Sequence, residues 1–361
     1  MTKGLLGVLA VVPTIFLASS ATRDLQEAVR TQSACKDEAT AATADSLAAR
    51  FDDHQFVFIG STHGDQKIEE FLACLVTRPS FSQRVTDIVQ EQTSSGQQAL
   101  LDRYILQLDP VGPGELASIW FDTDAPTLWT TLPPVRRFAE TLREVNSGLP
   151  PEKRIRLVGG NEGIGWSTVT VTEDLASYPF KTNLMPHLLV EHLAREPGNR
   201  TLVVYGDCHI HWKGNNFMRD LEAALGRARL LVVGRITQLV PAERAFLTGL
   251  GDPEKPFFVP GDRFPPDAAG PASLRICAGE QSGRLADYMD AFVYLGPEWD
   301  RSLIGTIPLT AVQQRELERR NSIKANAQRT MRARFSGRDR WFAKHPKDFA
   351  PRPGFPPTRG H

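Results

Sequence analysis

Short apolar segments alternate along this chain with segments of helical periodicity, and several of the apolar segments end in glycine. Residues 56–60 read FVFIG and residues 201–206 read TLVVYG. Uninterrupted apolar runs of this length, rich in β-branched and aromatic residues, are typical of strands buried on both faces, as in parallel sheets. The alternation therefore predicts an α/β fold, with a mainly parallel sheet of about five to six strands and helices on both faces.

The expected elements share one domain, residues 50–310, because the 361-residue chain is 41% hydrophobic and shows no repeat. Residues 22–49 are expected to be a helical or linker segment, and loop-rich insertions are expected at about 110–131 and 240–288. Strands are expected at residues 56–60, 86–89, 154–160, 201–206, 230–236 and 291–296. Helices are expected where apolar residues recur three and four positions apart, at residues 66–77, 97–108, 133–145, 181–195 and 216–225.

The N-terminus has the layout of a secretory signal peptide. In residues 1–21, Lys3 precedes an apolar run at residues 4–18, and small residues follow up to Ala21. This run is shorter than the ~20 residues that a stable membrane span needs. We therefore expect cleavage and an exported protein, periplasmic or extracellular, without a stable membrane span afterwards. An uncleaved anchor and a buried first helix are the alternatives.

Export would permit disulfides, and the chain has four cysteines. Cys35, Cys74, Cys208 and Cys277 allow three pairings, and the sequence does not choose among them. Cys74 lies on the apolar face of the helix expected at 66–77, which favours a buried free thiol.

Charge is balanced overall but uneven along the chain. Lys+Arg and Asp+Glu both number 42, which argues against a nucleic-acid partner. Residues 311–361 hold 13 Lys+Arg and 4 Asp+Glu, against 29 and 38 in the rest. We expect a basic helix at 311–334 and an extended, proline-rich end. This tail could bind an anionic surface, but we favour a basic arm lying on its own acidic body.

Polar residues cluster where the expected strands end, which is where ligands bind in open α/β sheets. The candidates that follow the first four strands are Ser61 and His63, then Glu91, then Asn161 and Glu162, and finally Asp207, His209 and His211.

Two G-x-x-H turns are the most specific part of this cluster. His63 follows Gly60 and His209 follows Gly206, each at the same spacing. Together with Glu91, two imidazoles could coordinate a divalent metal or relay protons around a bound water. The alternative is a buried hydrogen-bond network that only braces the loops. The sequence has neither a G-x-S-x-G turn nor a phosphate-binding G-x-x-x-x-G-K-[ST] loop.

These motifs resemble a known superfamily. The G-x-x-H-G turn, the E-x-F of the next helix (residues 69–71), the strand ending in Glu91 and the late G-x-x-H are similar to erythromycin-esterase-like, ChaN-like and TraB/Tiki proteins. The likeness spans roughly residues 50–236, and a late Y-L-G-P at residues 294–297 is similar to uncharacterised exported bacterial members. Residues 87–104, DIVQEQ…LLDRY, resemble the esterase-like branch in layout.

The resemblance implies that His63, Glu91 and His209 are the catalytic or metal-binding residues. In the esterase-like branch, residues at these positions catalyse hydrolysis. In the Tiki-like branch, they imply a divalent-metal protease. The ChaN-like branch is linked to haem and iron uptake. The chain departs from the esterase pattern at Ser61, where that branch has a glutamate, and at Asn161, where it has an acidic residue.

We therefore predict an exported hydrolase that activates water for a small-molecule or peptide substrate. Glu91 or His63 would be the base, and His209 would orient the water or bind metal. A non-catalytic haem- or metal-binding protein of ChaN-like type is the alternative, and a structural periplasmic protein with a decayed site is a third. Further candidates for binding substrate or supporting the site are Ser61, Asn161, Glu162, Asp207, His211 and Arg103.

Overall fold

The computed structural model of the chain describes residues 35–61, 66–123, 133–161, 166, 169–170, 188–194, 198–213, 216–236, 241–266, 283–296 and 308–334. The expected signal peptide at residues 1–21 and the proline-rich end of the tail lie outside the described residues, as do His63, Glu162 and Cys277.

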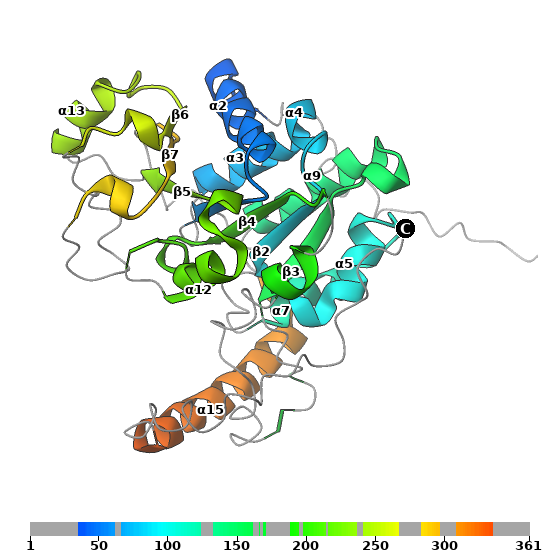
Figure 1. Cartoon of the computed structure of the whole chain (residues 1–361). Helices are drawn as coiled ribbons and strands as arrows, with labels where there is room; N and C mark the ends of the chain where they lie inside the picture. Colours follow the sequence, from blue (N-terminus) through cyan, green and yellow to red (C-terminus); the bar gives the residue numbers. More distant parts are fainter. Residues whose placement is uncertain are drawn as a thin grey trace, which may run out of the picture.

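One seven-stranded sheet organises the molecule, with strand order β3-β2-β4-β1-β5-β7-β6 (Figure 1). Every neighbouring pair is parallel except β6 and β7, which are antiparallel. The α/β fold is thus confirmed. The strands are β1 Phe56–Ser61, β2 Asp87–Ser94, β3 Arg156–Asn161, β4 Thr201–Gly206, β5 Leu230–Ile236, β6 Phe257–Pro260 and β7 Ala291–Tyr294.

The sheet has one strand more than expected, because β6 falls in the segment at 240–288 that was expected to be only loops. This strand is four residues long and ends at Pro260, so its sequence resembles a loop. An edge strand needs hydrogen bonds on one side only, which makes a short strand ending in proline acceptable there. Pairing with β7, rather than the local sequence, therefore makes Phe257–Pro260 a strand.

Helices flank the sheet, mostly where the periodicity predicts them. The α-helices are α2 Glu38–Ala48, α3 Gln66–Thr77, α4 Pro79–Ser82, α5 Gln98–Ile105, α6 Pro113–Leu116, α7 Ser118–Phe121, α9 Pro133–Ser147, α12 Asn216–Leu225, α13 Pro241–Thr248 and α15 Ala311–Arg334. Of the helix expected at 181–195, only a π-helical segment at Leu188–Leu193 and Ala194 are described. α5 ends three residues before the expected Leu108, whose φ is +61°.

Each face of the sheet has its own apolar core, as alternation along the strands requires. On β1, Val57 and Ile59 belong to the cluster that contains residues of α2, α3, α5 and α9. Phe56 and Phe58 belong to the other cluster, which contains residues of α12 and the second half of the chain. Residue parity along a strand therefore tells which face a side chain occupies.

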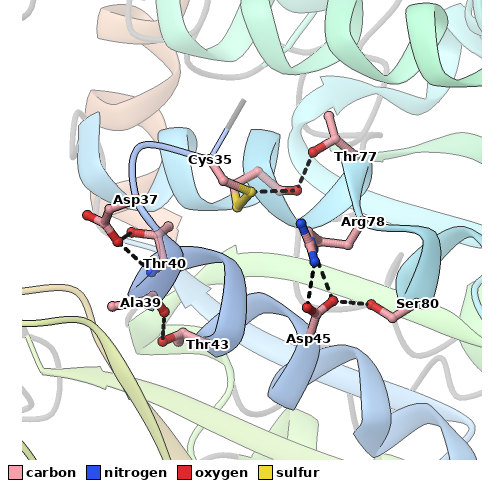
Figure 2. The surroundings of a disulfide bond; sticks show 10 residues. Cys35, Asp37, Ala39, Thr40, Thr43, Asp45, Thr77, Arg78 and Ser80 are labelled. Carbon is pink, nitrogen blue, oxygen red and sulfur yellow. Dashed lines mark hydrogen bonds and ion pairs between the residues drawn. A yellow bond between two sulfur atoms is a disulfide. The ribbon is translucent and has the colours of Figure 1, made fainter. Parts of the chain in front are cut away.

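A disulfide between Cys35 and Cys74 ties the start of the described chain to α3. The expectation that Cys74 is a free thiol is therefore wrong: the cysteine is on the apolar face, as predicted, but a second sulfur meets it there. Around this bond, the Arg78 guanidinium holds Asp45 of α2 with a shortest N–O distance of 2.7 Å (Figure 2). Cys208 is also disulfide-bonded.

The expected basic helix at 311–334 is present as α15, which projects away from the sheet (Figure 1). Its middle is anchored by Arg320, which is 6% exposed and donates to the Phe121 carbonyl oxygen at 2.6 Å. The same guanidinium lies over the rings of Phe121 and Trp166. Among the described residues, no helix has both the length and the apolar character needed to cross a membrane.

Candidate functional site

The carboxyl edge of the sheet contains an irregularity in β2. This strand continues to Ser94, beyond the expected end, and its register with β3 shifts between Gln90 and Ser94. The Thr93 hydroxyl donates to the Gln90 carbonyl oxygen at 2.9 Å. A β-carbon at Gly159 would lie 2.5 Å from the Ser94 backbone, so β3 can pass the shifted segment only with glycine there. Bulges of this kind re-aim side chains next to functional sites.

Glu91 lies in this shifted segment and is 1% exposed. Its Oε2 accepts a hydrogen bond from the backbone N–H of Gly206 at 2.6 Å, and its Oε1 lies 3.9 Å from Nε2 of His209. A buried carboxylate is stable only with such donors or opposite charges around it. The structure thus brings together two of the three residues expected at the centre of the site.

His209 is carried by the turn Asp207–His209 that directly follows β4. Its side chain is 41% exposed, and the ring of Tyr205 meets it edge-on with centroids 5.9 Å apart. The Tyr205 hydroxyl donates to the Gly160 carbonyl oxygen, and its ring stacks on Phe217. The imidazole therefore stands between a buried carboxylate and solvent, next to a tyrosine that is itself fixed.

Asp207 lies against β1, which explains the glycine that ends the apolar run there. A β-carbon at Gly60 would lie only 1.7 Å from Oδ1 of Asp207. Ser61 of β1 is in register with Gly206 of β4, so the ends of these two strands are adjacent. The G-x-x-H turns therefore begin side by side, while the position of His63 lies outside the described residues.

His211 behaves as a buried neutral imidazole. It is 5% exposed, packs edge-on against Tyr288, and its Nε2 has no hydrogen-bond partner among the described residues. Burial, with a smaller contribution from His209, lowers the pKa of His211 to about 4. This side chain is therefore uncharged at neutral pH.

The remaining candidates have separate surroundings. Asn161 ends β3, is 1% exposed and is in register with Ser94. Arg103 forms ion pairs with Glu115 at 2.9 Å and with Asp109 at 3.8 Å.

No group of three His, Cys, Asp or Glu side chains placed to hold a metal is found in the described part of the chain. Glu91 and His209 provide two donors, and His63, the third predicted ligand, is not described.

A second polar group, on the α3 face of the same edge, was not assigned a role from the sequence. Glu69 of α3 is 6% exposed, and its Oε1 accepts from Nε2 of Gln92 at 3.1 Å. Burial raises the pKa of Glu69 to about 7. The available signal was a carboxylate on the apolar face of a helix, together with glutamines at buried strand positions.

No family model matches the sequence, and no match was found among curated proteins. Solved structures with a similar arrangement include a Bacillus cereus protein, 11% identical over 74% of this chain and 92% of that one (TM-score 0.46). A succinoglycan biosynthesis protein is 13% identical over 78% and 98% (TM-score 0.48). ChaN of Campylobacter jejuni, described for cofacial haem binding, is 13% identical over 54% and 87% (TM-score 0.35). Likenesses at this level carry no argument about ligand or reaction.

Proposed function

We propose that this chain is a hydrolase in which His209, supported by the buried carboxylate of Glu91, activates a water molecule. The observation that carries the proposal is the placement of the two side chains: a carboxylate 1% exposed, 3.9 Å from an imidazole that is 41% exposed. Carboxylate–imidazole pairs of this type orient the ring and stabilise its protonated form. The 3.9 Å separation is longer than a hydrogen bond, and catalytic contacts of this kind commonly shorten only when substrate binds.

The proton path follows from the geometry of the pair. Nε2 of His209 is the ring nitrogen directed at Oε1 of Glu91, which leaves Nδ1 to accept a proton from water. The resulting imidazolium is stabilised by the Glu91 carboxylate, which the Gly206 amide keeps in place. The hydroxide formed in this way attacks an ester, amide or peptide carbonyl, and the imidazolium returns the proton to the leaving group.

A panel of esters, amides and peptides tests this function. We expect the wild-type protein to hydrolyse at least one class and His209→Gln to lose activity by ~10²–10⁴-fold, the usual contribution of a general base. His54→Gln is the matched control, because His54 precedes β1 at the opposite edge of the sheet and its Nδ1 contacts the Arg50 carbonyl oxygen. Full activity of His209→Gln, or no hydrolysis of any substrate, would contradict the proposal.

A divalent metal is compatible with the same residues. Glu91 and His209 would hold it together with His63, the predicted third ligand. A metal bound there would lower the pKa of a coordinated water. In either version, His209 and Glu91 position the water at the carboxyl edge of the sheet.

Haem binding is the second candidate function. The observation that favours it is the exposed imidazole of His209 beside the stacked rings of Tyr205 and Phe217, because an accessible histidine can serve as an axial ligand of haem iron. Titration with haemin should then give a visible absorption spectrum of ligated haem that is lost in His209→Ala and kept in His54→Ala. An unchanged spectrum in His209→Ala would exclude this residue as the ligand.

We further propose that the protein is exported. The disulfide between Cys35 and Cys74, and the second one at Cys208, favour an oxidising compartment. Residues 1–30 fused to a periplasmic reporter should direct secretion, and mass spectrometry should place the mature N-terminus within a few residues of Ala21. An intact N-terminus in the cytosol would reject export.

A further inference from the structure

Five polar side chains lie on the α3 face of the sheet, at the carboxyl end of its apolar core. Counting along the strands from residues of that core shows it: Ile59, Ile88 and Val233 all belong to the cluster that packs against α3. The next residues of the same parity are Ser61 on β1, Gln90 on β2, which is in register with Val204, and Arg235 on β5. Gln92 lies on this face because its amide donates to Glu69 of α3.

All five are buried to an extent that is unusual for their types. Their exposed fractions are 3% for Ser61, 6% for Glu69, 0% for Gln90, 2% for Gln92 and 2% for Arg235. The position of β4 in the same row is Gly206, which is in register with Ser61 and has no side chain. β4 therefore contributes no side chain beside Ser61.

Several polar atoms of this group are unpaired. The Ser61 hydroxyl, Oε2 of Glu69, both amide atoms of Gln90 and Oε1 of Gln92 have no hydrogen-bond partner among the described residues. Buried polar groups are almost always paired, and each one left without a partner destabilises the fold by ~1–3 kcal/mol. Unpaired atoms on four buried side chains of one sheet face, two of which are hydrogen-bonded to each other, indicate that something polar lies between them.

We propose that Ser61, Glu69, Gln90 and Gln92 enclose ordered water molecules on the α3 face of the sheet edge, with which Glu69 exchanges a proton. Water fits this chemistry, since the open atoms include both donors and acceptors, and a buried water typically makes about three hydrogen bonds to such groups. A proton that reaches these waters from solvent passes from a hydronium oxygen to Oε2 of Glu69, so the carboxylate becomes a carboxylic acid as the hydronium becomes water, and the reverse.

The electrostatics of the compartment agree with this exchange. Burial raises the pKa of Glu69 to about 7, and the hydrogen bond from Gln92 is the opposing influence. The other charged member of the group is Arg235, whose pKa burial lowers to about 9. Glu91 contacts Gly206 and His209, so Glu69 is a separate acid–base group.

The test compares Glu69→Gln with Glu70→Gln. Gln at position 69 can still accept from Gln92, so the helix should keep its packing. Glu70, the adjacent carboxyl of α3, contacts Gln66 and is the matched control. Infrared difference spectra recorded across neutral pH should show a carboxylic-acid carbonyl band that shifts in D₂O. This band should be absent in Glu69→Gln and present in Glu70→Gln.

A high-resolution crystal structure provides a second, independent measurement. Electron density for water should appear within hydrogen-bonding distance of Oε2 of Glu69 and of the Gln90 amide, and Gln90→Leu should remove part of it. A dry compartment, an organic molecule in the density, or a band unaffected by Glu69→Gln would each overturn the proposal. None of these results depends on whether the protein hydrolyses a substrate.

Discussion

Oε2 of Glu91 on β2 lies 2.6 Å from the backbone nitrogen of Gly206 at the end of β4, 115 residues later in the chain. The other oxygen of the same carboxylate faces His209, three residues beyond Gly206. One buried side chain therefore fixes the start of the turn that carries the imidazole and also provides the negative charge beside it. A mutation of Glu91 can therefore remove the negative charge while it keeps the shape of the side chain.

Glu91→Gln is expected to remove the function while the fold remains. The amide oxygen of Gln can still accept from the Gly206 N–H, but it cannot stabilise an imidazolium or bind a metal as a carboxylate does. We expect hydrolysis, and metal content if metal is present, to fall at least ~10–100-fold, with a stability change on the order of 1 kcal/mol. Activity assays, metal analysis and melting temperatures measure the three effects.

Equal metal content in wild type and Glu91→Gln, at or near zero, would contradict the metal version of the site. Unchanged hydrolysis in Glu91→Gln would contradict the role of the pair. A bracing network alone would give no activity in either protein and only a modest change in melting temperature.

The sequence predicted most of the sheet because buried parallel strands have an apolar signature that depends on few other residues. It also placed Glu91 and His209 in one cluster at the carboxyl edge, and the structure brings these two side chains to 3.9 Å. The register shift of β2, and the continuation of this strand past Glu91 to Ser94, were not predictable, because they depend on how β2 packs against Gly159 of β3. The buried polar group that contains Glu69, Gln90 and Gln92 was not predicted, because α3 and β2 come into contact only in the folded chain.

Two buried groups should give opposite pH dependences of stability. Glu69 has a folded pKa raised to about 7, so between pH 4.5 and 7 the unfolded chain loses this proton first, and stability falls as pH rises. His211 has a folded pKa lowered to about 4, so below pH 6.5 the unfolded chain gains this proton first, and stability falls as pH falls. Each slope is at most about 1.4 kcal/mol per pH unit.

Between about pH 4.5 and 6.5 these contributions oppose one another in the wild-type protein, and the single variants should separate them. Stability of Glu69→Gln should fall on acidification across this interval, whereas stability of His211→Gln should fall as the pH rises. Urea unfolding at several pH values measures both slopes. Identical slopes for the two variants would show that neither group titrates as the structure indicates.

The disulfide between Cys35 and Cys74 should make a large contribution to stability. It closes a loop with a sequence separation of 39 residues that contains α2 and β1. Loop-closure entropy for this length corresponds to about 4 kcal/mol at 25 °C. The variant Cys35→Ser with Cys74→Ala should show this loss in guanidinium unfolding while the second disulfide, at Cys208, stays intact. Stability equal to that of the wild type would contradict the expectation.

The contact made by Arg320 should decide whether α15 stays attached to the body. Its guanidinium donates to the Phe121 carbonyl oxygen and lies 5.0 Å from the centre of the Trp166 ring, in a position that is only 6% exposed. Arg320→Met keeps much of the volume but removes the ion pair with Glu316, the hydrogen bond to Phe121 and the cation–π contacts. The hydrogen bond and one cation–π contact together contribute about 2 kcal/mol. We expect faster tryptic cleavage after Lys324, a site of α15 that the substitution keeps, and a change in tryptophan fluorescence. Arg315→Met, at an exposed position of the same helix, is the control and should leave both unchanged. Cleavage at the wild-type rate in Arg320→Met would show that other contacts hold the helix.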